Sequence, residues 1–162
     1  MANTFKRVLS TTASTSATTV DYTIAGLGAS DVIKGVEIEV CRSTTLGTAT
    51  DDASGCRGFT DGTTEAVMGW WSEHGVTTSN CDTYTASDAV VALIDPATGT
   101  LDCEAAFDSF IENGVRLSWS NAASSAWRMT VIFTVGPDVE CDVQIVDPSD
   151  SISGTVTVTP GY

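Results

Sequence analysis

The chain has 162 residues, a formal net charge of −14 at pH 7 and a pI near 4.1, with seven Lys and Arg residues in all. Phosphate backbones and anionic membranes attract clustered basic side chains, so this composition argues against nucleic-acid binding and against membrane attachment. No apolar run approaches the roughly 20 residues of a membrane helix. The 25 Thr and 17 Ser residues, with only two Lys, favour β-structure over helix.

The N-terminal residues predict an arm. The start MANTFKR lacks the apolar core of a secretion signal, so we expect assembly in the cytoplasm. Residues 10–19, STTASTSATT, have no apolar face to bury. We therefore expect residues 1–19 to form an extended arm that orders on a neighbouring subunit, and residues 20–162 to form a single domain. The arm's apolar residues, which are candidate subunit contacts, are Phe5, Val8 and Leu9.

Short apolar or alternating segments separated by turn residues fill the rest of the chain. They predict strands at 20–24, 36–40, 66–73, 89–94, 115–119, 127–135, 139–146 and 153–159. Residues 101–111 fit either a strand or a short helix. Residues 43–55 and 75–88 are rich in turn residues and predict loops.

About ten strands with almost no helix predict an all-β fold. Two antiparallel sheets packed face to face would bury the alternating residues, so we expect a β-sandwich of jelly-roll type, with a closed barrel as the alternative. The expected core consists of Val36, Ile38, Val40, Val91, Leu93, Leu117, Trp119, Met129, Val131 and Phe133.

Little in the chain points to catalysis or to a cofactor. His74 is the single histidine and lies beside a turn glycine, and the chain contains no Gly-x-Ser-x-Gly elbow. Asp51 and Asp52 lack the spacing of a calcium loop, and the glycines form no nucleotide-binding pattern. We expect no enzyme activity, no catalytic residues, no cofactor and no metal.

Five cysteines are too dispersed for a structural zinc site. Cys41 and Cys56 flank a loop, while Cys81 and Cys103 bracket the apolar segment 89–94. Adjacency along the chain makes Cys41–Cys56 and Cys81–Cys103 candidate disulfides that would form after release from the cell, with Cys141 left free. Buried or exposed free thiols are the alternative, because cytoplasmic synthesis keeps thiols reduced.

Tryptophans suggest where a partner could bind. Trp119 and Trp127 fall in phase with apolar neighbours and are expected on the core side. Trp70 and Trp71 are adjacent, so in a strand they point to opposite faces. The outward one is a candidate subunit contact.

Three segments resemble structural proteins of tailed bacteriophages. The opening MANTFKRVLSTTASTSATTVDYTIAG is similar to the start of short virion proteins. GFTDGTTEAVMGWWSEHGVTTSN and AAFDSFIENGVRLSWSNAASSAWRMTVIFTVG are similar to a β-rich unit of phage structural proteins. Together they cover residues 1–26, 58–80 and 105–136.

The resemblance implies a non-enzymatic, homo-oligomeric component of a virion. A capsid decoration or cement protein on the outer shell, bound to the major capsid protein or other virion proteins, accounts best for the Ser- and Thr-rich surface. A tail tube, neck or tail-fibre component is the alternative. A carbohydrate-binding β-sandwich module is a second alternative, since such folds often bind glycans through aromatic side chains.

Overall fold

The protein folds entirely as β-strands over the residues that the structure, a computed structural model, describes: 5–28, 30–45, 47, 52–78, 80–137 and 139–143. No helix occurs in these ranges, so the prediction of an all-β fold is confirmed. The strands are β1 Phe5–Thr12, β2 Thr19–Thr23, β3 Ile33–Cys41, β4 Ala53–Thr60, β5 Glu65–Glu73, β6 Asn80–Ala86, β7 Val91–Asp95, β8 Thr100–Ile111, β9 Gly114–Asn121 and β10 Arg128–Val135.

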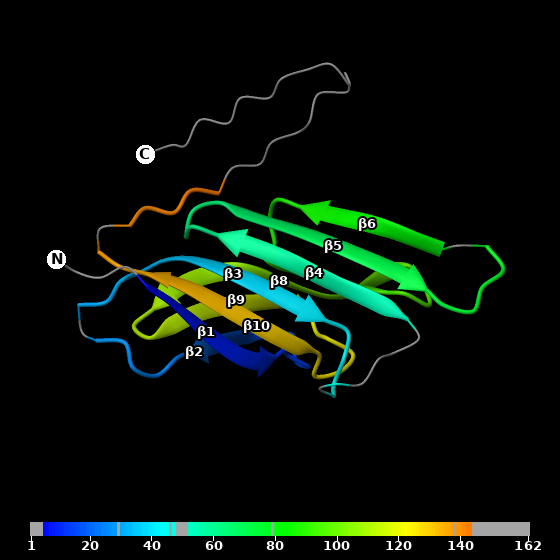
Figure 1. The fold of residues 1–162 in the computed structure, drawn as a ribbon, viewed down its shortest axis with the longest axis horizontal. Helices are drawn as coiled ribbons and strands as arrows, with labels where there is room; N and C mark the ends of the chain where they lie inside the picture. Colours follow the sequence, from blue (N-terminus) through cyan, green and yellow to red (C-terminus); the bar gives the residue numbers. More distant parts are fainter. Residues whose placement is uncertain are drawn as a thin grey trace, which may run out of the picture.

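Two antiparallel sheets form a β-sandwich (Figure 1). The larger sheet has the strand order β1-β10-β3-β4-β5-β6 and the smaller one has the order β2-β9-β8-β7. Strands β3 to β6, and strands β7 to β9, pair with one another in chain order. Three pairings, β1 with β10, β10 with β3 and β2 with β9, join distant parts of the chain. The jelly-roll connectivity that we expected is therefore not confirmed.

The core lies between the sheets, and every one of the ten predicted core residues is buried. Strand β10 shows the pattern most clearly, since its apolar residues alternate with half-buried ones that face outward. Its core side chains are Met129, Val131, Phe133 and Val135. The period-2 alternation in the sequence thus predicted the inward face correctly.

Strand β7 lies with its free edge against the larger sheet. The Ser54 hydroxyl donates a 2.6 Å hydrogen bond to the carbonyl of Ile94, and the buried Cys56 thiol lies against the backbone of Ala92. A Cβ atom at Gly58 would overlap the carbonyl oxygen of Val90. A glycine inside a strand commonly marks such an approach of another backbone. The inward face of β4 therefore covers the edge that β7 would otherwise leave unpaired.

Four segments differ in detail from the sequence prediction. Strand β4 begins inside the stretch 43–55, where we expected a loop, and no strand was expected at 56–60. Residues 101–111 belong to strand β8 and not to a helix. Strand β6 lies inside the turn-rich stretch 75–88, where we expected only a loop. The strands expected at 139–146 and 153–159 lie outside the described residues, except for 139–143, which are not in a strand.

The N-terminal arm expected over residues 1–19 is not confirmed. Phe5–Thr12 is strand β1, which pairs with β10 along its whole length without a register shift. Ala13 is buried, and its N–H donates to the carbonyl of Trp127 at 2.9 Å. This segment finds backbone partners within the chain itself, so the described part of the expected arm is an edge strand of the sandwich.

Candidate docking surface

The outward faces of the two sheets differ in chemistry. On the smaller sheet, Arg116 on β9 binds both carboxylate oxygens of Asp21 on β2, at 2.6 and 2.9 Å. The hydrogen bond from Arg116 lowers the pKa of Asp21. Beside this pair, the Ser120 hydroxyl donates to Glu104 at 3.0 Å. This face is polar, and its charged groups already have partners.

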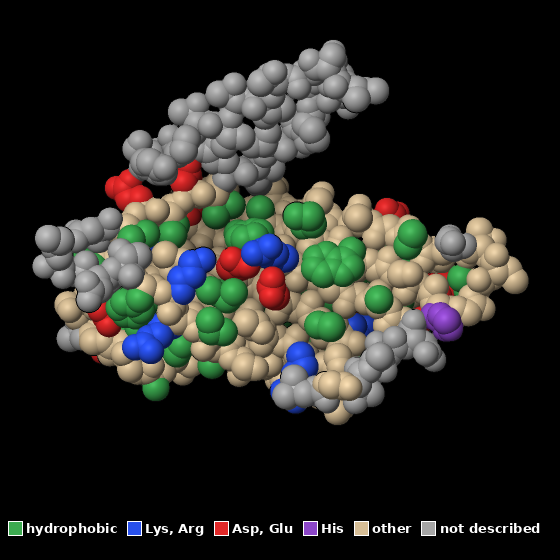
Figure 2. Space-filling model, in the orientation of Figure 1, with side chains coloured by type: hydrophobic (Ala, Val, Ile, Leu, Met, Phe, Trp, Pro, Cys, Tyr) green, Lys and Arg blue, Asp and Glu red, His purple; other side chains and the backbone are tan. Residues whose placement is uncertain are grey.

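The outward face of the larger sheet carries large apolar side chains, and we call it the outer face. Val8 on β1, Met68 on β5 and Trp70 on β5 are 60%, 52% and 48% exposed. Phe59 on β4 and Ile132 on β10 lie on the same face and are half-buried. Figure 2 shows this face, with apolar side chains on both sides of a small charged group. Exposed apolar residues gathered on one face are typical of an interaction surface.

The charged group at the centre of the outer face is internally paired. The guanidinium of Arg57 on β4 bonds to Glu37 and lies 3.5 Å from a carboxylate oxygen of Glu39, both on β3. The same guanidinium lies 5.2 Å from the ring centroid of Phe59, within cation–π range. The single guanidinium pairs with both carboxylates, and the group keeps a net charge of −1.

Trp70 lies flat on the sheet because its cross-strand neighbour is a glycine. Gly55 is the register partner of Trp70, and a Cβ at Gly55 would lie 2.7 Å from the indole Cζ2. Trp71 points to the opposite face, is half-buried and approaches Gly99 on the β7–β8 turn. The prediction that one of the two tryptophans points outward is confirmed, and Trp70 is that residue.

A shallow groove of about 640 Å³ runs along the outer face over β4, β5 and β6. Its lining includes Phe59, Ala66, Met68, Ala86, Asp142 and Val143. One wall comes from the segment that follows β10, since Asp142 and Val143 are far from the other lining residues in sequence. The groove is therefore built partly from the sheet and partly from residues 139–143, which we call the strap.

Asp61 attaches this strap to the β4–β5 turn. Its carboxylate accepts hydrogen bonds from the backbone N–H groups of Thr63, Thr64 and Val143, at 2.7, 2.7 and 3.0 Å. Burial raises the pKa of Asp61, but the three N–H groups outweigh it and hold the pKa below its ordinary value. The carboxylate is thus charged at neutral pH and holds the groove wall in place.

Two of the predicted N-terminal contact residues serve the core. Phe5 and Leu9 are partly buried and pack against the core from β1. Val8, between them in the alternation, points outward. Of the three residues, only Val8 contributes to the outer face. Phe5–Thr12 is a strand, and its alternation directs Phe5 and Leu9 towards the core.

The disulfides that we expected are not formed, since all five cysteines are free. Cys41 pairs in register with Gly55, and Cys56 pairs with Val40, so the two thiols point to opposite faces of the sheet. Cys81 is exposed on β6, whereas Cys103 is buried in the core from β8. Both pairings therefore join an outward position to an inward one, which a disulfide cannot bridge without backbone movement.

His74 is exposed in the turn after β5, and its backbone N–H donates to Asp52 at 2.9 Å. This bond involves the backbone and does not orient the imidazole. Among the described residues, no three His, Cys, Asp or Glu side chains lie close enough to hold a metal ion. Asp51 lies outside the described residues. In the part of the chain that the structure describes, no helix has the length and apolar character to span a membrane.

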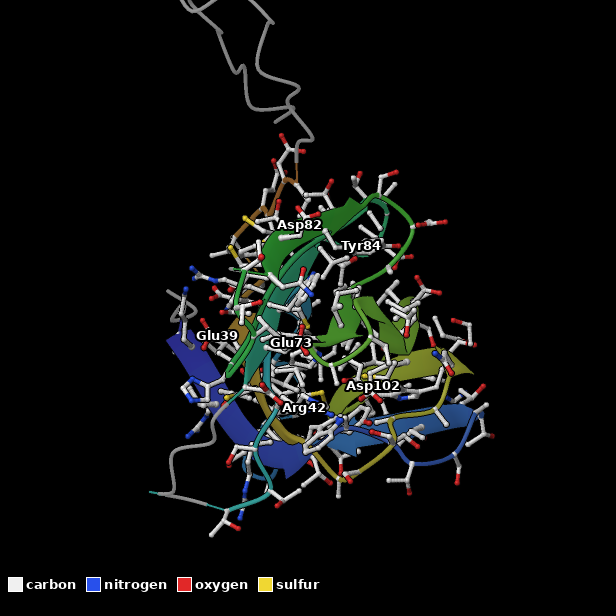
Figure 3. All side chains as sticks on the ribbon, turned by 90° about the vertical axis from the view of Figure 1, so that its right-hand side faces the viewer. Glu39, Arg42, Glu73, Asp82, Tyr84 and Asp102 are labelled. Atoms are coloured by element: carbon white, nitrogen blue, oxygen red, sulfur yellow. The ribbon has the colours of Figure 1, made fainter. Side chains whose placement is uncertain are left out.

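A polar cluster closes the end of the sandwich where β3 ends (Figure 3). The guanidinium of Arg42 lies 5.1 Å from the ring centroid of Trp127 and 3.4 Å from Asp95 at the end of β7. The indole N–H of Trp127 donates to Asp102 on β8 at 2.5 Å. The cluster therefore connects the two sheets and stabilises this end of the sandwich.

Sequence reasoning found part of the outer face and missed the rest. It singled out Val8 and Trp70 but not Met68, although a residue two positions before Trp70 shares its face. Phe59 lies just after the predicted loop 43–55, so no strand assignment placed it on a face. Ile132 sits at an outward position of a strand whose alternation drew attention to the inward residues.

No protein-family model matches the chain, and no curated protein sequence matches it. Among solved structures, the chain is similar to the tailspike protein of the Acinetobacter phage vB_ApiP_P1, with 12% sequence identity and a TM-score of 0.33. The match covers 81% of this chain and 21% of the tailspike chain, so the protein spans about a fifth of that chain's length. A TM-score this low does not establish a shared fold.

Proposed function

We propose that the protein is a non-catalytic structural component of a tailed-phage particle, and that it attaches through the outer face of the larger sheet. The observation that carries the proposal is the contrast between the two outward faces. Val8, Met68 and Trp70 are exposed together on one face, whereas the ion pair of Asp21 and Arg116 lies on the other. Covering the apolar face would remove that area from water, and each large side chain fully buried gains about 1.5–3 kcal/mol.

The sequence supports a particle protein in two further ways. Its opening and its β-rich segments resemble tailed-phage structural proteins, as described above. Its net charge of −14 disfavours a position in contact with the packaged DNA, because DNA and an acidic surface repel each other. An outer-shell position, as a decoration or cement protein bound to the major capsid protein, requires one docking face and one face that tolerates solvent. The two faces of this sandwich match that requirement.

Binding to assembled particles tests the proposal. Particles grown without the protein are incubated with the purified chain, and the bound amount is measured by co-sedimentation. We expect Met68→Glu combined with Trp70→Glu to weaken binding at least tenfold, because each carboxylate would have to be desolvated at the contact. Ser118→Glu, which adds a charge to the exposed outward side of β9, is the matched control and should bind as the wild type does.

A particle reconstruction with the bound chain then locates it. Density on the shell supports the decoration role, whereas density confined to the tail or neck supports the particle role and rejects the shell position. Equal binding by the outer-face variant and the wild type would reject the outer face as the docking surface. Binding of the isolated chain to a glycan array, without binding to particles, would favour the carbohydrate-binding alternative.

A further inference from the structure

The larger sheet ends in two strands that have a backbone partner on one side only. Within the described residues, β1 pairs only with β10, and β6 pairs only with β5. The two strands lie at opposite margins of the sheet (Figure 1). Each therefore presents a row of N–H and C=O groups to which another strand can bond.

Strand direction makes these two edges complementary. All five pairings in the larger sheet are antiparallel, so β1 and β6, separated by four strands, run in opposite directions. A second copy placed beside the first in the same orientation brings its β6 next to β1 as an antiparallel neighbour. Their lengths also match, at eight and seven residues.

We propose that copies of this chain associate head to tail, with β6 of one copy adding to β1 of the next to extend the larger sheet from molecule to molecule. Strand β6, of sequence NCDTYTA, contains no Lys and no Pro, and it pairs with β5 without a bulge. Those are the features that commonly prevent edge strands from pairing. Their absence from β6 is expected of an edge that pairs in the assembly.

Charge and side-chain facing specify a register for the contact. Arg7 on β1 and Asp82 on β6 both lie on the inward side of their edges, as the alternation of each strand shows. Placing Arg7 opposite Asp82 also sets Phe5 opposite Tyr84 and brings Val8 opposite Cys81 on the outward side. Strand β1 has two basic and no acidic residues, and β6 has one acidic and no basic residue. Opposite charges directly across an antiparallel pair stabilise it, and like charges destabilise it.

The inference goes beyond the proposed function, because it concerns contacts between copies and not attachment to a particle. It can fail while the outer face still binds particles, and the reverse also holds. The test therefore uses the purified full-length chain in the absence of particles.

Cysteine cross-linking tests the register. In a Cys41→Ser background, which removes the exposed thiol of β3, Val8→Cys should form a disulfide with Cys81 of the adjacent copy. Directly opposed residues have Cα atoms about 4.5–5.5 Å apart, within disulfide range. Copper phenanthroline with dissolved oxygen takes up the two electrons and two protons released by the thiols. We expect a ladder or a closed ring of linked copies on a non-reducing gel.

The matched control is Thr12→Cys, in the same background and on the same side of β1. It lies four residues from Val8, about 13 Å along the strand, and should cross-link at least tenfold more slowly. Adding Cys81→Ser to Val8→Cys should abolish the ladder. Far-UV circular dichroism verifies that each variant keeps its β-structure.

Charge reversal provides an independent measurement. Sedimentation velocity should show that Arg7→Glu and Asp82→Arg each reduce association, and that the double variant restores it. Equal cross-linking at residues 8 and 12 would overturn the proposal. So would disulfide-linked dimers of Cys81 with itself, which indicate a two-fold contact, or a chain that stays monomeric at high micromolar concentration.

Discussion

Phe133 occupies the centre of the core, fully buried on β10. Its register partners, Val36 on β3 and Arg7 on β1, lie on the two strands that flank it. We expect Phe133→Ala to lower the free energy of unfolding by about 3–5 kcal/mol, the range for large buried aromatics. Urea denaturation measures it, with Phe59→Ala on the outer face as a milder comparison. A loss below about 1 kcal/mol would mean that the strand faces are assigned incorrectly.

Cys56 is a buried thiol, and its raised pKa makes the free energy of unfolding depend on pH in alkaline solution. Burial raises the pKa of its thiol to about 11, and burial also raises the pKa of Cys103 and Tyr22. Well below pH 9, the ordinary pKa of a thiol, Cys56 is protonated in both the folded and the unfolded chain, so it does not make the free energy of unfolding depend on pH. Above pH 9 the unfolded chain releases its proton first, so the free energy of unfolding falls as the pH rises towards 11.

The expected outcome is a shallower alkaline decline in Cys56→Ala than in the wild type. Cys41→Ala, which removes an exposed thiol, is the control and should leave the slope unchanged. The free energy of unfolding is measured by urea titration at several pH values between 8 and 11. Identical slopes for the wild type and Cys56→Ala would contradict a buried, protonated thiol.

At the scale of elements, the contact between β4 and β7 depends on a missing side chain. We expect Gly58→Ala to destabilise the fold by at least about 2 kcal/mol, because the added methyl group would overlap the Val90 carbonyl and push the sheets apart. Gly28→Ala is the control, since Gly28 is exposed and its new Cβ would make only ordinary contacts. Thermal unfolding measures both, and equal melting temperatures for both variants would contradict the close approach.

Strand β1 contributes to the core and pairs with β10. Deleting residues 2–12 removes Phe5 and Leu9 from the core and leaves β10 without its outer neighbour. We expect a loss of at least about 3 kcal/mol, from two apolar side chains at about 1.5–3 kcal/mol each. Deleting only residues 2–4 should change the urea midpoint little. A chain lacking residues 2–12 that unfolds at the wild-type midpoint would support an arm and contradict an edge strand.

The strands differ in how well the sequence predicted them. Strand β10 was predictable because each inward position carries a large apolar residue. Strand β4 was missed, because Ser54, Cys56 and Gly58 face inward and lack that signal. Strand β6 was missed because an edge strand with exposed residues shows no apolar alternation.

The outer face was less predictable than the core for a related reason. It forms only when β1, β10, β4 and β5 meet in one sheet in a definite register. Val8 and Met68 are 60 residues apart in sequence, and nothing local to either one specifies that they share a face. Pairing between distant strands depends on the whole fold, so candidate contact residues could be found singly but not as a surface.

The whole molecule combines a strongly acidic net charge with an exposed apolar face. A net charge of −14 disfavours non-specific contacts between copies, because like charges repel each other. The outer face offers an apolar contact whose central charges are already paired, and the edges offer backbone contacts. A protein with these properties is suited to bind where many copies are held side by side on a larger structure.

Oxidative footprinting tests whether the protein docks on a particle through the outer face. Hydroxyl radicals oxidise exposed Met and Trp side chains, so Met68 and Trp70 should react readily in the free protein. On the particle we predict that both react at least fivefold more slowly, while His74, exposed in the turn after β5, reacts at an unchanged rate. Met68 and Trp70 that stay as reactive on the particle as in the free protein would contradict docking through the outer face.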